Sequence, residues 1–294
     1  MPPSAAIIAV GSELLSGQII NRNAGTISAR LFDVGFDTSV HLTVDDIEGD
    51  IVEALVLAAS KSDLLFVTGG LGPTSDDLTR HAVAQWAKLK LVYHGDSWTH
   101  IERQFGRLGL KPPETNRQQC YFPRGASVLV NQAGTANAFS FTSHGKYVWV
   151  LPGPPREIDV VWADHVQAAV VALSRPEDRK ILRMWRTVGK GESHLAEIIE
   201  PIVTGHGMDI AYRAHPPYIE TKLRFPATRA AELKPVIERL EGALSKWLFE
   251  VDREDTAKSL AKCLATFGTV DIYDGVSQGH MLEMLSPELR EQMK

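Results

Sequence analysis

Short apolar runs alternate with amphipathic segments through the first half of the chain. Runs rich in aliphatic and β-branched residues predict buried strands at 5–10, 38–43 and 63–68. Between them, apolar residues recur at helical spacing over 21–32 and 47–59. Strands that alternate with helices form parallel sheets with helices on both faces. The pattern therefore predicts an α/β fold with a mostly parallel, three-layer sheet.

The alternation continues, less regularly, to about residue 173. A helix that contains Trp86 follows the third strand, and the pair Pro112-Pro113 interrupts regular structure beyond it. The further expected elements are a helix at 96–108, strands at 128–130 and 147–151, and a closing helix at 158–173.

A polar stretch at 174–178 reads as a linker to a second, smaller domain. Beyond it, the pattern predicts strands at 181–188, 210–212 and 219–225, and helices at 193–202 and 230–247. We expect three parts: a first domain at 1–174, a small α+β domain at 175–251, and a helix-rich tail at 252–294.

Composition narrows the function classes. The 294 residues are 44% hydrophobic and 23% charged, as in soluble globular proteins, and the net charge of −5 gives no general attraction to nucleic acid. No apolar run reaches the ~18 residues of a membrane span. Neither a basic segment before residues 7–10 nor a CxxC motif is present, so we expect a cytoplasmic protein without nucleic-acid or membrane partners.

The segment 68–79, Thr-Gly-Gly-Leu-Gly-Pro-Thr-Ser-Asp-Asp-Leu-Thr, is the most informative one. It joins a predicted buried strand to a predicted helix, where unpaired backbone N–H groups and the helix dipole bind phosphate. Asp76 and Asp77 would repel a bare phosphate, so a divalent cation between carboxylates and phosphate oxygens is expected. The alternative is that an aspartate caps the helix and the glycines only turn the chain.

Polar residues also follow the first two strands. Glu13 and Asn23, in the segment 11–23, can contact a sugar or a metal-bound water. Asp46 can meet Asp77 across the strand ends, because ligands bind open sheets at that edge. The alternative for these residues is ordinary helix capping, by Asn21 or Asn23 in the first segment and by an aspartate in the second.

Two later loops are expected at the same edge. Gly134 and Thr135, within 131–137, can offer backbone N–H groups to a second phosphate. The segment 152–157, Pro-Gly-Pro-Pro-Arg-Glu, follows the last strand and begins a helix, where proline suits the first turn. Plain loop architecture explains both segments equally well.

Taken together, these segments resemble the amino-terminal domain of the competence-damage-inducible CinA family, which has the molybdopterin-binding-like fold. The matching features follow the family's order over roughly residues 5–170, and 180–250 resembles the family's middle domain. The matching features of the amino-terminal domain are 11–23, Asp46 with Ile51, 68–79, 116–119, 131–136 and 152–157.

The resemblance implies an ADP-ribose pyrophosphatase that cuts ADP-ribose to AMP and ribose 5-phosphate. It also implies a divalent metal (Mg²⁺, Mn²⁺ or Co²⁺), potassium in relatives, and a homodimer. On this hypothesis Asp46 and Asp77 hold the metal and act in catalysis with Asp76. The expected substrate contacts are Gly11, Glu13, Asn23, Gly69, Gly70, Gly72, Thr74, Gln119, Asn131, Gly134, Thr135, Pro152 and Gly153.

The sequence departs from the family at several positions. Ser12 stands where an aspartate is usual, Gln118 where a lysine is common, and Asn137-Ala138 and Pro154 replace Pro-Gly and a valine. These changes bear on substrate choice. The rival functions are a molybdopterin-handling adenylyltransferase, which would use the same loop and aspartates, and a catalytically silent nucleotide-binding scaffold.

The tail resembles the start of the deamidase domain that full-length relatives carry. Residues 256–270 match its first helix and strand, and 273–279 resemble an eroded copy of its opening motif, with Gly275 at the serine position. We therefore expect no deamidase activity on nicotinamide mononucleotide.

Overall fold

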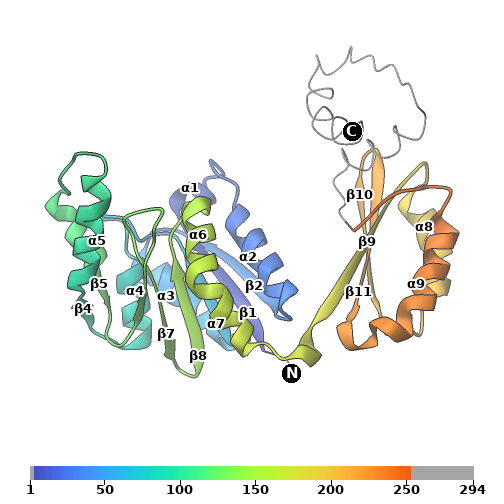
Figure 1. The fold of residues 1–294 in the computed structure, drawn as a ribbon, viewed down its shortest axis with the longest axis horizontal. Helices are drawn as coiled ribbons and strands as arrows, with labels where there is room; N and C mark the ends of the chain where they lie inside the picture. The colour runs from blue at the N-terminus through green and yellow to red at the C-terminus, as the bar shows by residue number, and fades with distance from the viewer. Residues whose placement is uncertain (1–2, 253–294) are drawn as a thin grey trace, which may run out of the picture. The chain divides into compact units, whose positions relative to one another are not determined.

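The structure is a computed structural model that describes residues 3–252 (Figure 1). The chain divides into two compact units between Arg179 and Lys180, five residues beyond the expected break after residue 174. The short helix η3 (Pro176–Asp178) lies within the linker segment. The predictions for 253–294 lie outside the described residues.

The first unit is built on a six-stranded sheet in the order β2-β1-β3-β8-β7-β6. Its four neighbouring strands β2 (Asp37–Val44), β1 (Ser4–Val10), β3 (Leu64–Thr68) and β8 (Lys146–Leu151) are parallel. The remaining pairs, β8 with β7 (Ala138–Ser143) and β7 with β6 (Ser127–Leu129), are antiparallel. The expectation of a mostly parallel sheet is confirmed.

Helices cover both faces of this sheet, as a buried parallel sheet requires (Figure 1). Alternate residues of β1 point to opposite faces: Ala6 and Ile8 join one core cluster, and Ala5 and Ile7 join the other. The first cluster packs under α3 (Glu48–Lys61) and α4 (Thr79–Ala87), and the second under α2 (Arg22–Asp33) and the helical segment after β8. That segment comprises α6 (Pro155–Val161), the π-helical η2 (Trp162–Val166) and α7 (Gln167–Leu173).

Several elements of the first unit were not predicted. The clearest is β7, which joins β8 through a tight hairpin at His144 and Gly145, both with positive φ (51° and 72°). Two-residue turns with positive φ match the twist of the flanking strands of a hairpin. The pair His144-Gly145 was the feature of the sequence that could have indicated this hairpin. The other unpredicted elements are α1 (Ser12–Leu15), β4 (Leu91–Tyr93), η1 (Glu114–Cys120) and β5 (Tyr121–Pro123). In contrast, the helix predicted at 96–108 is present as α5 (Gly95–Gly106).

The second unit has an antiparallel four-stranded sheet in the order β10-β11-β9-β12. Two helices, α8 and α9, bury Leu195, Leu240 and neighbouring apolar residues against Trp185 and Leu223 of this sheet. The helix predicted at 230–247 ends at residue 244, and a turn at 245–247 leads into an unpredicted strand that pairs with β9. The bounds are β9 (Lys180–Val188), α8 (Glu192–Val203), β10 (Asp209–His215), β11 (Tyr218–Pro226), η4 (Ala227–Arg229), α9 (Ala230–Leu244) and β12 (Leu248–Val251).

Candidate functional site

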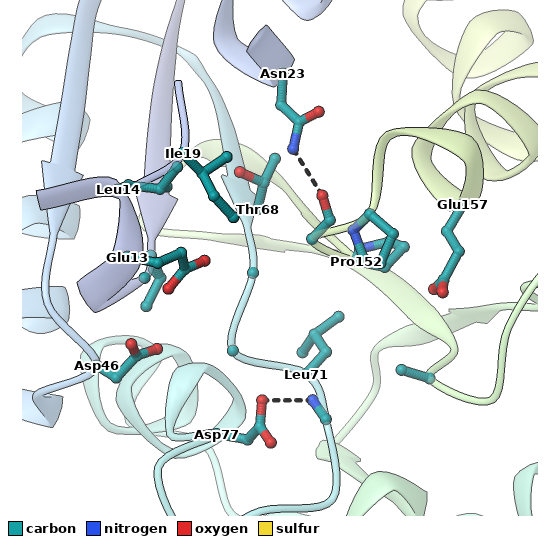
Figure 2. A pocket seen from close by; sticks show the side chains of 18 of the residues that line it. Glu13, Leu14, Ile19, Asn23, Asp46, Thr68, Leu71, Asp77, Pro152 and Glu157 are labelled. Atoms are coloured by element: carbon teal, nitrogen blue, oxygen red, sulfur yellow. Dashed lines mark hydrogen bonds between the residues drawn. The ribbon is translucent and has the colours of Figure 1, made fainter. Parts of the chain in front are cut away.

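A pocket of about 930 Å³ opens at the carboxyl ends of the four parallel strands of the first unit. Each strand contributes the loop that follows it, so segments far apart in the sequence meet at one sheet edge (Figure 2). Most of the residues that the sequence predicted line this pocket. They are Gly11, Glu13, Asn23, Asp46, Gly69, Gly70, Gly72, Asp76, Asp77, Gln119, Thr135, Pro152 and Gly153.

Three predicted contacts are not among the pocket-lining residues. Thr74 instead donates its backbone N–H and its hydroxyl to Asp77. Asn131 and Gly134 lie behind the wall that Glu157 forms. The structure therefore gives these three residues a supporting position.

Two positions in the turn after β3, residues 69 and 70, have no room for a side chain. Gly69 has a φ of 94°, and a Cβ there would lie 2.2 Å from the carbonyl oxygen of Val10. Gly70 has a φ of 64°, and a Cβ would lie 2.1 Å from Oγ1 of Thr79. Both conformations are rare for residues with a side chain. These two glycines allow the loop to lie directly on β1 and α4.

Asp77 closes this loop on itself. Its Oδ1 accepts the N–H of Gly72 (2.6 Å), and its Oδ2 accepts the N–H (2.8 Å) and the hydroxyl (2.5 Å) of Thr74. Three of the roughly four acceptor positions of the carboxylate are thus occupied. Asp77 thus stabilises the loop that precedes it and does not cap α4, whose N-cap is Leu78 without a side-chain hydrogen bond. Its role as a metal ligand stays a prediction.

Buried side chains hold the carbonyl groups of the same loop. Arg80, with 1% of its surface exposed, donates to the carbonyl oxygens of Leu71 (2.7 Å) and Gly72 (2.9 Å). Burial lowers the pKa of this guanidinium to about 10, and Asp77 opposes the shift. Gln119 also donates to Leu71 O (3.2 Å). Sequence reasoning missed Arg80, since one arginine in an amphipathic helix usually lies at the surface.

Gln118, noted as a departure from the family, contacts the loop as well. Its Nε2 donates to the carbonyl oxygens of Thr74 (2.6 Å) and Gly72 (3.3 Å). Gln118 therefore stabilises the loop after β3 through hydrogen bonds to its backbone.

Among the described residues, the first turn of the loop, at 69–72, keeps two adjacent N–H groups without a hydrogen bond. Gly69 N–H donates to Leu151 O (3.2 Å), and Gly72 N–H donates to Asp77. The N–H groups of Gly70 and Leu71, both in the pocket wall, form no hydrogen bond within the part of the chain described. Adjacent free amides at a strand-to-helix turn are a favourable place for an anion.

Asp46 lines the same pocket as Asp76 and Asp77 (Figure 2). Its Oδ2 accepts the N–H of Ser12 (2.9 Å). Burial raises the pKa of Asp46, and the charges of Glu13, Asp45 and Asp76 raise it further, against the hydrogen bond from Ser12. A carboxylate in such an acidic surrounding gains stability from a cation.

The fit of a divalent metal depends on what the protein offers. Among residues 3–252, no cluster of three or more His, Cys, Asp or Glu side chains forms a complete ligand set. Asp46 keeps one oxygen without a hydrogen bond from the described residues, whereas both oxygens of Asp77 are bonded. Mg²⁺ is commonly held by one or two carboxylates together with waters and substrate phosphates. The residues present fit that arrangement, with Asp46 as the more available ligand.

The opposite wall of the pocket is formed by the loop after β8. Asn23 Nδ2 donates to Gly153 O (2.7 Å) and joins this loop to the start of α2. Glu157, in the first turn of α6, lines the pocket and accepts a hydrogen bond from Asn131 Nδ2 (2.6 Å). Burial raises the pKa of Glu157, although this hydrogen bond lowers it. Glu157 lies in the segment 152–157 but was not among the predicted site residues.

Comparison with known proteins now gives the family. The family model described as "Probable molybdopterin binding domain" matches residues 6–171. The crystal structure of the protein CinA, of unknown function, from Thermoplasma acidophilum aligns with a TM-score of 0.53 and 30% identity, covering 57% of this chain and 98% of that chain. The chain therefore belongs to the molybdopterin-binding domain family, and its relatives place it among the CinA-like members.

Curated relatives extend the similarity beyond the first unit. A competence-damage inducible protein of Caldanaerobacter subterraneus subsp. tengcongensis is 34% identical over 267 residues, covering 89% of this chain and 64% of that protein. Its counterpart in Alkaliphilus metalliredigens is 37% identical over 253 residues, covering 82% and 60%. The chain thus spans less than two thirds of the length of these curated relatives. Within the described residues, no helix is long and apolar enough to cross a membrane.

Proposed function

We propose that this protein is a metal-dependent hydrolase of the pyrophosphate bond of ADP-ribose, which it cuts to AMP and ribose 5-phosphate, or of a related dinucleotide, which it cuts to two nucleoside monophosphates. One observation carries the proposal. Gly70 and Leu71, whose N–H groups are free within the described residues, line the same pocket as Asp46, a partly buried carboxylate with other carboxylates nearby. Amides that suit a phosphate beside a carboxylate that suits a cation are what a metal–pyrophosphate ligand needs.

Each residue has a specific task in this proposal. Gly70 and Leu71 bind a phosphate oxygen through their N–H groups, and Asp77 keeps the loop in the conformation that presents them. Asp46, with Asp77 and Asp76 beside it, holds the divalent cation, Mg²⁺, Mn²⁺ or Co²⁺. When bound, the cation supplies charge neutralisation at the pyrophosphate and a water of lowered pKa. Potassium as a further activator is part of the proposal.

The experiment that tests it is a product assay. Purified protein is incubated with ADP-ribose, FAD or NADH and each of the three metals, with and without potassium, and products are separated by chromatography. AMP from ADP-ribose that disappears with a chelator supports the proposal. No turnover of any dinucleotide under any metal would overturn it and favour a silent nucleotide-binding scaffold.

Two variants connect the assay to the site. Asp46→Asn keeps the size and the hydrogen bond to Ser12 but removes the charge, so turnover should fall roughly 100-fold or more. Asp50→Asn is the matched control, because Asp50 is an exposed residue near the start of α3 and outside the pocket. It should retain wild-type turnover.

The family match favours a second candidate, a molybdopterin-binding enzyme of the adenylyltransferase type. Such an enzyme would place the pterin phosphate at the same free amides. It predicts tight pterin binding and transfer of AMP from ATP, without hydrolysis of ADP-ribose. Titration of a pterin and an assay for transfer, run beside the product assay, separate the two candidates.

A further inference from the structure

Glu157 is a carboxylate in the pocket for which the proposed chemistry has no task. It belongs to the first turn of α6, in the loop region after β8. Figure 2 shows it on the opposite side of the pocket from Asp46, with Leu71 between them. Because Glu157 lies away from Asp46, its presence in the pocket needs an explanation separate from the cation.

The protein holds this side chain in place from behind. Asn131 is fully buried, and its Nδ2 donates to Ala136 O (3.0 Å) as well as to Oε2 of Glu157 (2.6 Å). Its Oδ1 accepts the N–H of Ala133 (3.1 Å), which fixes the direction in which the amide donates. These hydrogen bonds fix the Asn131 side chain in an orientation in which its amide donates to Glu157.

A glycine provides the space for the same carboxylate. A Cβ at Gly134 would lie 2.5 Å from the carboxyl carbon of Glu157. The carbonyl oxygen of Gly134 is 3.0 Å from Nε2 of His100, which anchors this loop to α5. Asn131 and Gly134, which the sequence predicted as ligand contacts, therefore position a residue that lines the pocket.

In the described part of the chain, only Asn131 donates a hydrogen bond to the carboxylate of Glu157. Within residues 3–252, its carboxylate has the single hydrogen bond from Asn131 and no cation within ion-pair distance. An ionised carboxylate has about four acceptor positions, and leaving them unmet in a partly buried place is unfavourable. A phosphate would be repelled here, whereas a neutral group with two adjacent O–H donors matches the two oxygens. Acidic side chains bind ribose in this way in dinucleotide-binding sheets.

We propose that Glu157 binds a ribose of the nucleotide by accepting hydrogen bonds from its vicinal hydroxyl groups. The inference rests on the proposed function, because it takes the ligand to be a ribonucleotide. It assigns the wall after β8 to sugar and the turn after β3 to phosphate. The hydroxyls belong either to the adenosine ribose or to the terminal ribose of ADP-ribose, and the test distinguishes them.

The test measures binding affinity by calorimetry on the full chain with Mg²⁺ present. It combines ligands that lack one ribose hydroxyl group with a substitution of Glu157. The ligand pairs are AMP with 2′-deoxy-AMP, and ribose 5-phosphate with 2-deoxyribose 5-phosphate. Glu157→Gln should weaken binding of one ribose ligand roughly tenfold to a hundredfold and leave its deoxy partner within about threefold. Glu102→Gln, an exposed carboxylate of α5, is the control and should change neither.

The outcomes separate the two proposals. If Glu157→Gln weakens the ribose and deoxyribose ligands equally, or neither, the assignment of ribose to Glu157 is overturned. If the wild-type protein binds AMP but discriminates in neither pair, the inference fails while the proposed function stands. If it binds none of these ligands, the proposed function itself fails. Thermal unfolding of each variant, measured in parallel, excludes loss of fold as the cause.

Discussion

Asp77 and Asp46 lie at the same edge of one sheet, yet the protein treats them differently. Asp77 accepts three hydrogen bonds from its own loop, whereas Asp46 accepts one, from Ser12, among three other carboxylates that raise its pKa. A carboxylate whose acceptor positions are filled by the protein stabilises a conformation. A carboxylate whose acceptor positions are free, and which is repelled by neighbouring carboxylates, is available to bind a cation. The comparison predicts that the first is needed for the fold of the site and the second for its function.

The largest expected loss of stability follows removal of the side chain beneath the loop. Arg80→Ala leaves a cavity and takes two hydrogen bonds from Leu71 and Gly72, so the free energy of unfolding should fall by about 3 kcal/mol. Urea unfolding followed by circular dichroism measures this. Arg103→Ala, an exposed arginine of α5, is the control and should stay within about 0.5 kcal/mol of wild type. An equal, small effect of both would contradict the support role of Arg80.

The second prediction addresses the comparison itself. Asp77→Ala should reduce the free energy of unfolding by about 2 kcal/mol, because the N–H groups of Gly72 and Thr74 lose their acceptor. Asp46→Asn should leave stability unchanged or raise it, because it removes repulsion from Glu13, Asp45 and Asp76. Thermal unfolding of the two variants side by side checks this. A larger loss for Asp46→Asn would reverse the assignment of the two aspartates.

The third prediction concerns the backbone of the phosphate loop. Gly70→Ala places a Cβ 2.1 Å from Thr79 Oγ1 at a φ of 64°, so it should cost about 1–2 kcal/mol and weaken AMP binding. Gly25→Ala is the matched control, since its Cβ meets nothing within 4 Å in α2. Alanine there should stabilise the helix by about 0.5–1 kcal/mol. AMP affinity unchanged by Gly70→Ala would argue against phosphate at this turn.

The smallest effect is a pH dependence. Burial raises the pKa of Glu157 in the folded state, so its ionisation, as pH rises above the ordinary value of 4.5, costs the folded state more than the unfolded chain. The stabilising contribution of the protonated form is present below that value and is lost as pH rises through the folded pKa. Wild type should therefore lose stability relative to Glu157→Gln as pH rises from the ordinary value of 4.5 through the raised pKa of the folded state. Parallel melting curves test this, and an opposite trend would contradict it.

The sequence predicted the fold well where the pattern was strong. Apolar runs such as 64–67 lie at the centre of the sheet, and polar residues after the strands meet at one edge, as parallel topology requires. No strand was predicted at β7 or at β12. β12 is an edge strand of four residues, and so short a run carries too little periodicity to be assigned without its neighbours.

For the site, the sequence identified residue types but not their partners. Nothing in the segment 68–79 shows that Asp77 is bonded within its own loop while Gly70 keeps a free N–H. Nor does spacing show that Arg80 turns inward, or that Asn131 and Gly134 act through Glu157. These distinctions depend on hydrogen bonds that form only after the chain has folded.

The measurement that tests the central claim most directly is AMP release from ADP-ribose by wild type and Asp46→Asn under the same metal. Both proteins are compared at a temperature where melting curves show them equally folded. We predict metal-dependent AMP and ribose 5-phosphate from the wild type, and roughly 100-fold less from Asp46→Asn. Equal rates for the two proteins, or no product from the wild type with any of the three metals, would contradict the account.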